Sequence, residues 1–187
     1  MEYVSAEKKS IALVVLAQKI GYSKTAVIAF SLGSAVIGGS FGPTNPFGVI
    51  IAQKVAEVAA RGVRIEHIHR VDRTGYKAGA LDSAMNKVQG EFIAIFDADF
   101  VPESDWLQRT MPYFETDDNI GVVQTRWGHL NKNYSLLTEL QAFGLNGHFA
   151  AEQGGRNAAG HFINFNGTGG IWRKKCIESA GGWEHDT

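Results

Sequence analysis

Asp97 and Asp99 follow a short apolar segment and are the pair of residues whose spacing most directly suggests chemistry. The apolar run from Phe92 to Phe96 predicts a buried strand, along which side chains alternate with a period of two. Both carboxylates therefore project from one face of the strand's end, where they repel each other unless a cation or a shared proton lies between them. Pro102 excludes a continued central strand, which places the pair at the ligand-binding edge of an α/β sheet. A divalent cation holding a diphosphate fits this pattern, whereas a solvated surface turn is the competing interpretation.

A basic segment punctuated by glycine precedes this strand and leads into a helix that we expect to end at Gly90. Lys77 falls in the first turn of that helix, where the backbone N–H groups favour an anion and the helix dipole disfavours a cation. Phosphate binding would explain a lysine at this place. A solvated basic turn would explain it without a ligand, so both interpretations remain open.

A glycine-rich loop lies near the C-terminus and comprises Phe165, Asn166, Gly167, Thr168, Gly169 and Gly170. Its glycines allow the backbone to approach a ligand closely, and Trp172 offers a flat face for stacking. The spacing lacks the third glycine of a dinucleotide-binding fingerprint, so that interpretation is rejected. Upstream, four polar residues either line a site or form a solvated helix end: His148, Glu152, Gln153 and Arg156.

Helical and strand patterns alternate along most of the chain and predict an α/β fold. Strands are expected within Ala26–Leu32 or Ala35–Ile37, and at Val63–Ile68, Phe92–Phe96 and Ile120–Thr125. Helices are expected at Val49–Arg61, from Lys77 towards Gly90, after a cap at Ser104, at Tyr134–Phe149 and at Lys174–Ala180. The helix after Ser104 has an apolar inner face that consists of Trp106, Leu107, Met111 and Phe114.

Composition limits the classes of function. The 187 residues carry a formal net charge of -1, which gives no reason to expect nucleic acid or another polyanion as a partner. The single cysteine, Cys176, excludes an internal disulfide framework and a cysteine-rich zinc site. Apolar runs are shorter than the roughly 18 residues that a membrane-spanning helix needs, so we expect a soluble segment.

Four ordered motifs together resemble the processive glycosyltransferases of family two, and most closely their cellulose synthase-like and glucomannan synthase-like members. The resemblance covers residues 49–187. It rests on Arg73-Thr74-Gly75-Tyr76-Lys77-Ala78-Gly79-Ala80-Leu81, Phe96-Asp97-Ala98-Asp99-Phe100-Val101-Pro102, Val123-Gln124-Thr125-Arg126-Trp127, and Phe165-Asn166-Gly167-Thr168-Gly169-Gly170-Ile171-Trp172-Arg173 with Gly181-Gly182-Trp183.

This resemblance implies an incomplete GT-A fold, which is Rossmann-like and binds a nucleotide-diphosphate sugar. It implies an inverting transfer of a hexose, from a donor of the UDP-glucose or GDP-mannose type, to a growing β-glycan. By position, Asp99 would coordinate Mg or Mn, and Asp97 would contact the ribose or the metal. Lys77 and Gly79 would lie near the donor. The acceptor sugar would meet Phe165, Asn166, Gly167, Thr168, Gly169 and Trp172.

The chain also departs from the family pattern. Residues 1–48 lack the expected donor-base segments and are interpreted as a divergent or replaced N-terminal segment, followed by a partial catalytic domain at residues 49–187. The expected catalytic base lies beyond Thr187, so the catalytic residue is unknown. In this family the full-length proteins associate with the cytoplasmic face of a membrane, whereas this segment is expected to be soluble and cytoplasmic.

Two alternatives belong to other classes of function. A non-catalytic fragment that binds sugar nucleotides would retain the acidic pair and the loop without the base. The strand that ends in Asp97 and Asp99 also fits phosphatases of the haloacid dehalogenase class, but those need a lysine later in the chain, and Lys77 comes earlier. The donor base, the linkage and the acceptor stay open.

Overall fold

The computed structural model describes residues 25–30, 46–62, 65–68, 74–97 and 100–184. Four strands, β1 (Thr25–Phe30), β2 (Phe92–Asp97), β3 (Val122–Gln124) and β4 (Gly170–Arg173), form one sheet. The helices are α2 (Pro46–Ala59), α3 (Tyr76–Met85), α4 (Trp106–Thr116), α5 (Leu136–Gly147), α6 (Gly154–Ala158) and α7 (Lys174–Ser179). A π-helix, η2 (His148–Gln153), joins α5 to α6. The prediction of an α/β fold is confirmed.

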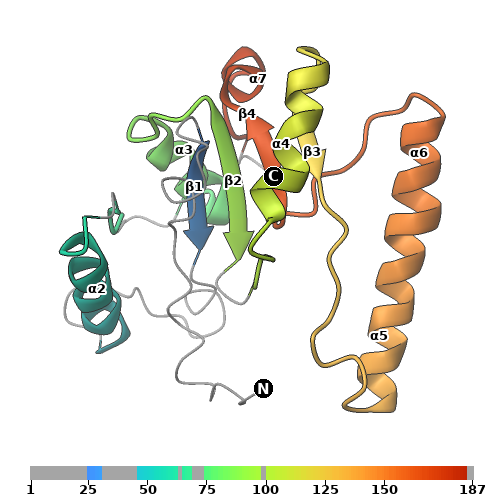
Figure 1. The fold of residues 1–187 in the computed structure, drawn as a ribbon, viewed down its shortest axis with the longest axis horizontal. Coiled ribbons are helices and arrows are strands. Elements are labelled where there is room, and N and C mark those ends of the chain that lie inside the picture. Colours follow the sequence, from blue (N-terminus) through green and yellow to red (C-terminus); the bar gives the residue numbers. More distant parts are fainter. Residues whose placement is uncertain (1–24, 31–45, 63–64, 69–73, 98–99, 185–187) are drawn as a thin grey trace.

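The sheet has the strand order β1-β2-β4-β3, and it mixes parallel and antiparallel pairs. β1 runs parallel to β2, with Phe30 opposite Asp97. β4 runs antiparallel to both neighbours, so that its first residue, Gly170, pairs with Ile95 of β2 and with Gln124 of β3. The end of β2, the end of β3 and the beginning of β4 therefore meet at one edge of the sheet (Figure 1).

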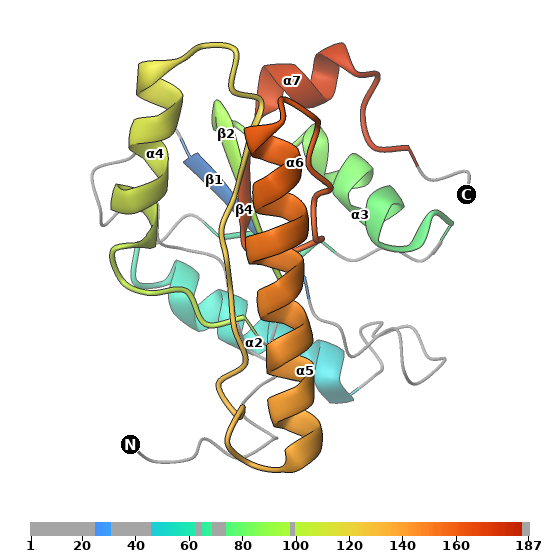
Figure 2. The same ribbon diagram turned by 90° about the vertical axis from the view of Figure 1, so that its right-hand side faces the viewer.

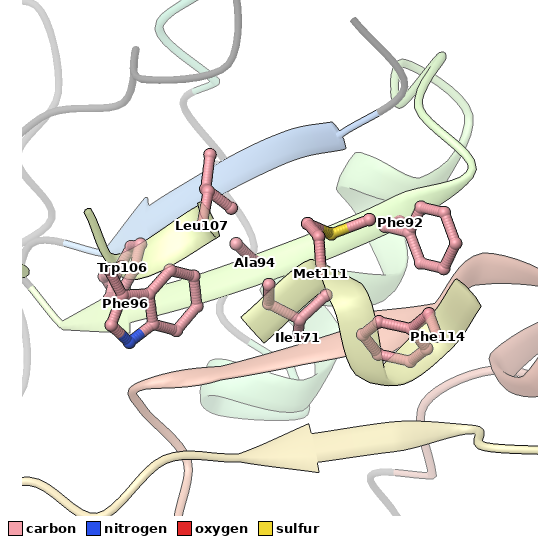
Figure 3. Close-up of a cluster of buried hydrophobic side chains, with 8 residues drawn as sticks. All are labelled: Phe92, Ala94, Phe96, Trp106, Leu107, Met111, Phe114 and Ile171. Atoms are coloured by element: carbon pink, nitrogen blue, oxygen red, sulfur yellow. The ribbon is translucent and has the colours of Figure 1, made fainter. Parts of the chain in front are cut away.

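Strand β2 is buried on both faces, as the apolar run predicted. Helix α4 covers one face of the sheet, while α3 and α7 lie on the other (Figure 2). The cluster on the α4 side comprises Phe92, Ala94, Phe96, Trp106, Leu107, Met111, Phe114 and Ile171 (Figure 3). Because strand side chains alternate, Ile93 and Ile95 point the other way and pack with Leu81 of α3 and Ile177 of α7.

Helix α4 confirms the predicted inner face and corrects the predicted cap. Trp106, Leu107, Met111 and Phe114 are all buried, and the helix is preceded by Asp105, whose side chain caps no N–H group. The expected cap at Ser104 is therefore wrong. The backbone makes the turn by itself, since the N–H of Trp106 donates to the carbonyl oxygen of Glu103 at 3.1 Å.

Other boundaries also differ from the sequence patterns. Helix α2 begins three residues earlier than Val49, and Gly62 follows its end with a φ of 80°, as expected of a glycine after a helix. The strand expected at Val63–Ile68 is wrong for the described residues 65–68, which have no ladder partner. Alternating polarity alone is therefore not enough to form a strand. Helix α3 ends at Met85, well before Gly90.

The glycine-rich loop ends in a strand that the sequence did not predict. The segment 170–173 forms β4, in the middle of the sheet, although it was interpreted as part of a loop. A Cβ atom on Gly170 would lie 2.6 Å from Cε2 of Phe165 and 3.2 Å from the carbonyl oxygen of Val123. Glycine at this position therefore allows strands β3 and β4 and the ring of Phe165 to pack closely.

Helix α5 confirms the helix expected over Tyr134–Phe149, with a shorter α-helical part. Ser135 caps it, since its hydroxyl accepts from the N–H of Thr138 while the Thr138 hydroxyl accepts from the N–H of Ser135. No residue of α5 is buried, and the helix stands away from the sheet (Figure 1). Its apolar side chains Leu136, Leu137, Leu140 and Phe143 are exposed.

The strand expected near Ala26 is confirmed as β1, whereas the alternative at Ala35–Ile37 lies outside the described residues. β1 belongs to the range that was interpreted as a divergent N-terminal segment, yet it pairs with β2 along its whole length. Among the described residues, no helix is both long enough and apolar enough to cross a membrane.

Candidate donor and acceptor site

Lys77 and Asp97 meet at the edge of the sheet where β2 ends. Asp97 shares a face of β2 with Ile93 and Ile95, because side chains alternate along a strand, and this is the face that α3 covers. Lys77 lies in the first turn of α3, directly after Gly75 and Tyr76, which both have a positive φ. Its ammonium group forms an ion pair with Oδ1 of Asp97. The helix start thus turns a cation towards the strand-end carboxylate.

The glycine-rich loop is tied to both of these residues. Nζ of Lys77 donates to the carbonyl oxygen of Gly167 at 2.6 Å. The N–H of Asp97 donates to Oγ1 of Thr168 at 2.9 Å, and Thr168 is 6% exposed. Gly167 and Gly169 have φ angles of 79° and 67°, a region that favours glycine. The predicted donor and acceptor residues are therefore in direct contact through Lys77 and Asp97.

Gln124 holds the loop from the other side and was not singled out by sequence reasoning. Its Nε2 donates to the carbonyl oxygens of Thr168 at 3.0 Å and of Gly169 at 3.3 Å. Its Oε1 accepts from the N–H of Asn166 at 3.0 Å. Gln124 belongs to the third quoted motif, which is the only sequence signal that pointed to it.

A second polar group, around His148, reaches the loop from the π-helix. His148 Nδ1 lies 2.8 Å from a carboxylate oxygen of Glu152, and its Nε2 lies 3.2 Å from Oδ1 of Asn166. Gln153 is 6% exposed, and its Nε2 donates to Asn166 Oδ1 and to the carbonyl oxygen of Asn164, both at 2.9 Å. The hydrogen bonds to Glu152 and Asn166 raise the pKa of His148 above 6.5, although partial burial opposes them. Arg156 is not part of this group, since its Nε donates to the carbonyl oxygen of Phe162.

The remaining predicted site residues lie in different surroundings. Phe165 and Trp172 pack edge to face with ring centroids 5.4 Å apart, and Trp172 packs in the same way on Trp183 at 5.5 Å. Trp172 is thus part of the cluster on the α3 side of the sheet rather than of the polar group. Gly79 is buried within α3. Asp99 and Arg73 lie outside the described residues.

The described residues fit a metal that is completed by phosphate oxygens rather than a cage made of protein ligands alone. Within the described ranges, no group of three or more His, Cys, Asp and Glu side chains could hold a metal ion. Mg²⁺ in nucleotide sites is commonly held by one or two carboxylates together with phosphate groups. Asp97, with a side chain 19% exposed, offers such a carboxylate at the strand end.

Fold and site together define a mixed α/β domain whose polar groups gather beyond the ends of β2 and β3. Residues 49–177 match the family model described as glycosyl transferase family 2. The chain is also 40% identical over 141 residues to "Probable glucomannan 4-beta-mannosyltransferase 15" of Arabidopsis thaliana. That alignment covers 74% of this chain and 26% of the relative, so the chain spans about a quarter of the relative's length.

The chain belongs to glycosyl transferase family 2. This membership confirms the resemblance and gives the domain the GT-A fold. It also overturns the interpretation as a phosphatase of the haloacid dehalogenase class.

Proposed function

We propose that this chain carries the donor site and part of the acceptor site of an inverting hexosyltransferase that extends a β-glycan. The donor would be a nucleotide-diphosphate sugar of the UDP-glucose or GDP-mannose type. The observation that carries this proposal is the contact of one ammonium group, that of Lys77, with the strand-end carboxylate of Asp97 and with the carbonyl oxygen of Gly167. Membership of glycosyl transferase family 2 supports it.

The proposed chemistry is the stabilisation of charge on a departing diphosphate. Mg or Mn, held by Asp97 and Asp99, would supply positive charge next to the diphosphate when bound. Lys77 supplies a second positive charge from the start of α3, and the N–H groups of that helix start favour an anion as well. Groups fixed in place before the reaction stabilise developing charge most effectively, which is the role we assign to the ties between Lys77, Asp97 and the loop.

We propose that the loop from Phe165 to Gly169 meets the acceptor sugar, with Trp172 supporting it from β4. The short distance between Lys77 and the Gly167 carbonyl supports this, because donor and acceptor must meet where the bond forms. The catalytic base is not assigned to any residue of this chain. We further propose that the full-length protein associates with a membrane at its cytoplasmic face, as the resemblance implies.

Calorimetric titration of the purified chain tests the donor site. UDP, UDP-glucose, GDP and GDP-mannose are compared with and without Mn²⁺, and we expect metal-dependent binding of one nucleotide class. Lys77→Met should weaken it by about tenfold or more, because a charged hydrogen bond contributes roughly 1.5–3 kcal/mol. Lys87→Met is the matched control, since Lys87 follows the other end of α3 and pairs with Glu66. The proposal would be contradicted if both variants changed the nucleotide affinity equally, or if the affinity were the same with and without Mn²⁺.

The alternative, a non-catalytic fragment, predicts the same binding without transfer. A labelled donor incubated with the chain and a β-1,4-linked mannotetraose separates the two. A lengthened oligosaccharide product supports the enzyme, whereas donor binding without any product supports the non-catalytic fragment.

A further inference from the structure

The π-helix η2 places two side chains against one histidine, which an α-helix would not allow. His148 contacts both Glu152 and Gln153, four and five residues further along the chain. In an α-helix with 3.6 residues per turn, a residue five positions further along the chain points about 140° away from the starting residue. In a π-helix, residues five positions apart are joined by the backbone hydrogen bond of one turn and lie next to each other. Short π-helical segments often occur at functional sites, and this one faces the glycine-rich loop through Asn166.

Counting hydrogens limits how this group can be bonded. The amide of Gln153 has two N–H hydrogens, which point to the carbonyl oxygen of Asn164 and to Oδ1 of Asn166. His148 Nε2 lies 3.2 Å both from this amide nitrogen and from Oδ1 of Asn166, so it either accepts from Gln153 or donates to Asn166. Turning the Asn166 amide around would place its NH₂ group against that of Gln153. Nδ2 of Asn166 is buried without a hydrogen-bond partner in the described part of the chain.

Both nitrogens of His148 carry hydrogen when Nε2 donates to Asn166. Nε2 donates to Asn166, and Nδ1 faces a carboxylate oxygen of Glu152, which can only accept when ionised. In that state the ring is an imidazolium, which is the form that the raised pKa of His148 favours. Glu152 is the charged group that favours this form, while Asn166 and Gln153 facing the ring are neutral amides. On the side of β3, the basic side chain of Arg126 is engaged with Asn146, two residues before His148.

We propose that His148, as an imidazolium held by Glu152, is a positioning residue that together with Gln153 fixes Asn166 and thereby the loop that meets the glycan acceptor. The backbone N–H of Asn166 bonds to Gln124, and the next residue, Gly167, bonds to Lys77. A displacement of Asn166 would therefore alter the hydrogen bonds of Gln124 and Lys77 to the loop. This inference rests on the proposed function of the loop, whereas the state of His148 can be measured without it.

The proposal predicts a pH dependence with a definite sign. A histidine whose pKa is raised on folding stabilises the folded arrangement fully below its unfolded value, near 6.5, and loses this contribution as pH rises through the folded pKa. Once Nε2 is deprotonated, it faces the acceptor Oδ1 of Asn166 with a lone pair. The contact then becomes repulsive, and the loop should loosen on the alkaline side.

Nitrogen-15 NMR of the full chain tests the state of His148. We expect both ring nitrogens to be protonated at pH 6, with a titration midpoint above 6.5 that falls in Glu152→Gln. The side-chain amide signals of Asn166 should shift with the same midpoint. His161→Gln is the control and should leave this shift in place. Two results would overturn the proposal. One is a ring that is protonated on one nitrogen only at pH 6, and the other is a pH-dependent shift of the Asn166 signals that persists in His148→Gln.

Acceptor binding provides the second readout, with a β-1,4-linked mannotetraose as the probe. Its affinity should fall by about two- to tenfold across the His148 titration, the range expected for the loss of one hydrogen bond. His148→Gln should make the affinity independent of pH, since its amide offers a donor that does not titrate. Nucleotide binding measured in parallel separates a failure of the proposed donor site from a failure of the role proposed for His148. Its absence would refute the proposed donor site, whereas intact nucleotide binding with no pH response at Asn166 would refute the role of His148.

Discussion

Lys77 joins segments that lie far apart in the chain, because its ammonium group contacts both Asp97 and the carbonyl oxygen of Gly167, 90 residues away. The residue types and their motifs predicted that Lys77 and Asp97 belong to one site. Gln124 was not predicted, since its partners are backbone groups of a loop more than 40 residues further on. Backbone partners leave no trace in residue types, so no pattern in the sequence reveals them.

The group around His148 was left open between a site and a solvated helix end. Helical spacing pairs His148 with Glu152 but not with Gln153, which only the π-helix brings into contact. The sequence offered no signal for the extra residue in that turn. The contact between Gln153 and His148 therefore could not be predicted from the sequence.

Gly169 should be among the least replaceable residues of the loop. Its φ is 67°, and a Cβ atom there would lie 2.9 Å from Cε2 of Phe100 and 3.2 Å from Cδ1 of Trp127. We expect Gly169→Ala to lower the free energy of unfolding by about 1–3 kcal/mol for the backbone strain, with a further loss from the contacts. Urea unfolding measures this.

Gly160→Ala provides the matched control, because Gly160 has a φ of 73° and no atom within 4 Å of an added Cβ. Gly160→Ala should lower the free energy of unfolding by the backbone strain alone. Equal losses in the two variants would mean that the packing of Phe100 and Trp127 does not restrict the loop.

At the scale of elements, the buried strand β2 and the inner face of α4 were predicted because a continuous apolar run and a helical period are strong signals. The strand β4 was missed because Gly169, just before it, and Gly170, its first residue, resemble a loop. The strand expected at Val63–Ile68 was wrong for residues 65–68, because alternating polarity does not by itself create a pairing with another strand.

Ile171 of β4 should contribute strongly to stability. It is fully buried between β2 and α4, within the cluster of Figure 3. We expect Ile171→Ala to reduce the free energy of unfolding by about 2–5 kcal/mol, through lost apolar contacts and the cavity that remains. Thermal or urea unfolding is the measurement.

Leu136→Ala on α5 is the control, because Leu136 is 72% exposed and loses the same number of carbon atoms. Its effect should stay within about 0.5 kcal/mol. A comparable loss from both variants would show that α5 is packed against another part of the molecule in solution.

At the scale of the whole molecule, the polar site lies at one edge of the sheet, whereas α5 projects away from it (Figure 1). Family membership could be inferred from the four motifs, and the comparison with family 2 confirms it. The arrangement of the sheet could not be inferred from the motifs, because they give the order of segments along the chain but not the strand order β1-β2-β4-β3. The contacts of Lys77 and Asp97 with the glycine-rich loop follow from that order.

The central claim is that a metal and a diphosphate bind where Lys77, Asp97 and the loop meet. Paramagnetic broadening by Mn²⁺ of the backbone amide signals, in the presence of GDP or UDP, tests this most directly. The account predicts that the signals of Lys77, Asp97 and Gly167 broaden first and that broadening requires the nucleotide. Broadening centred on the exposed acidic turn at Asp117 and Asp118, or broadening unaffected by the nucleotide, would contradict it.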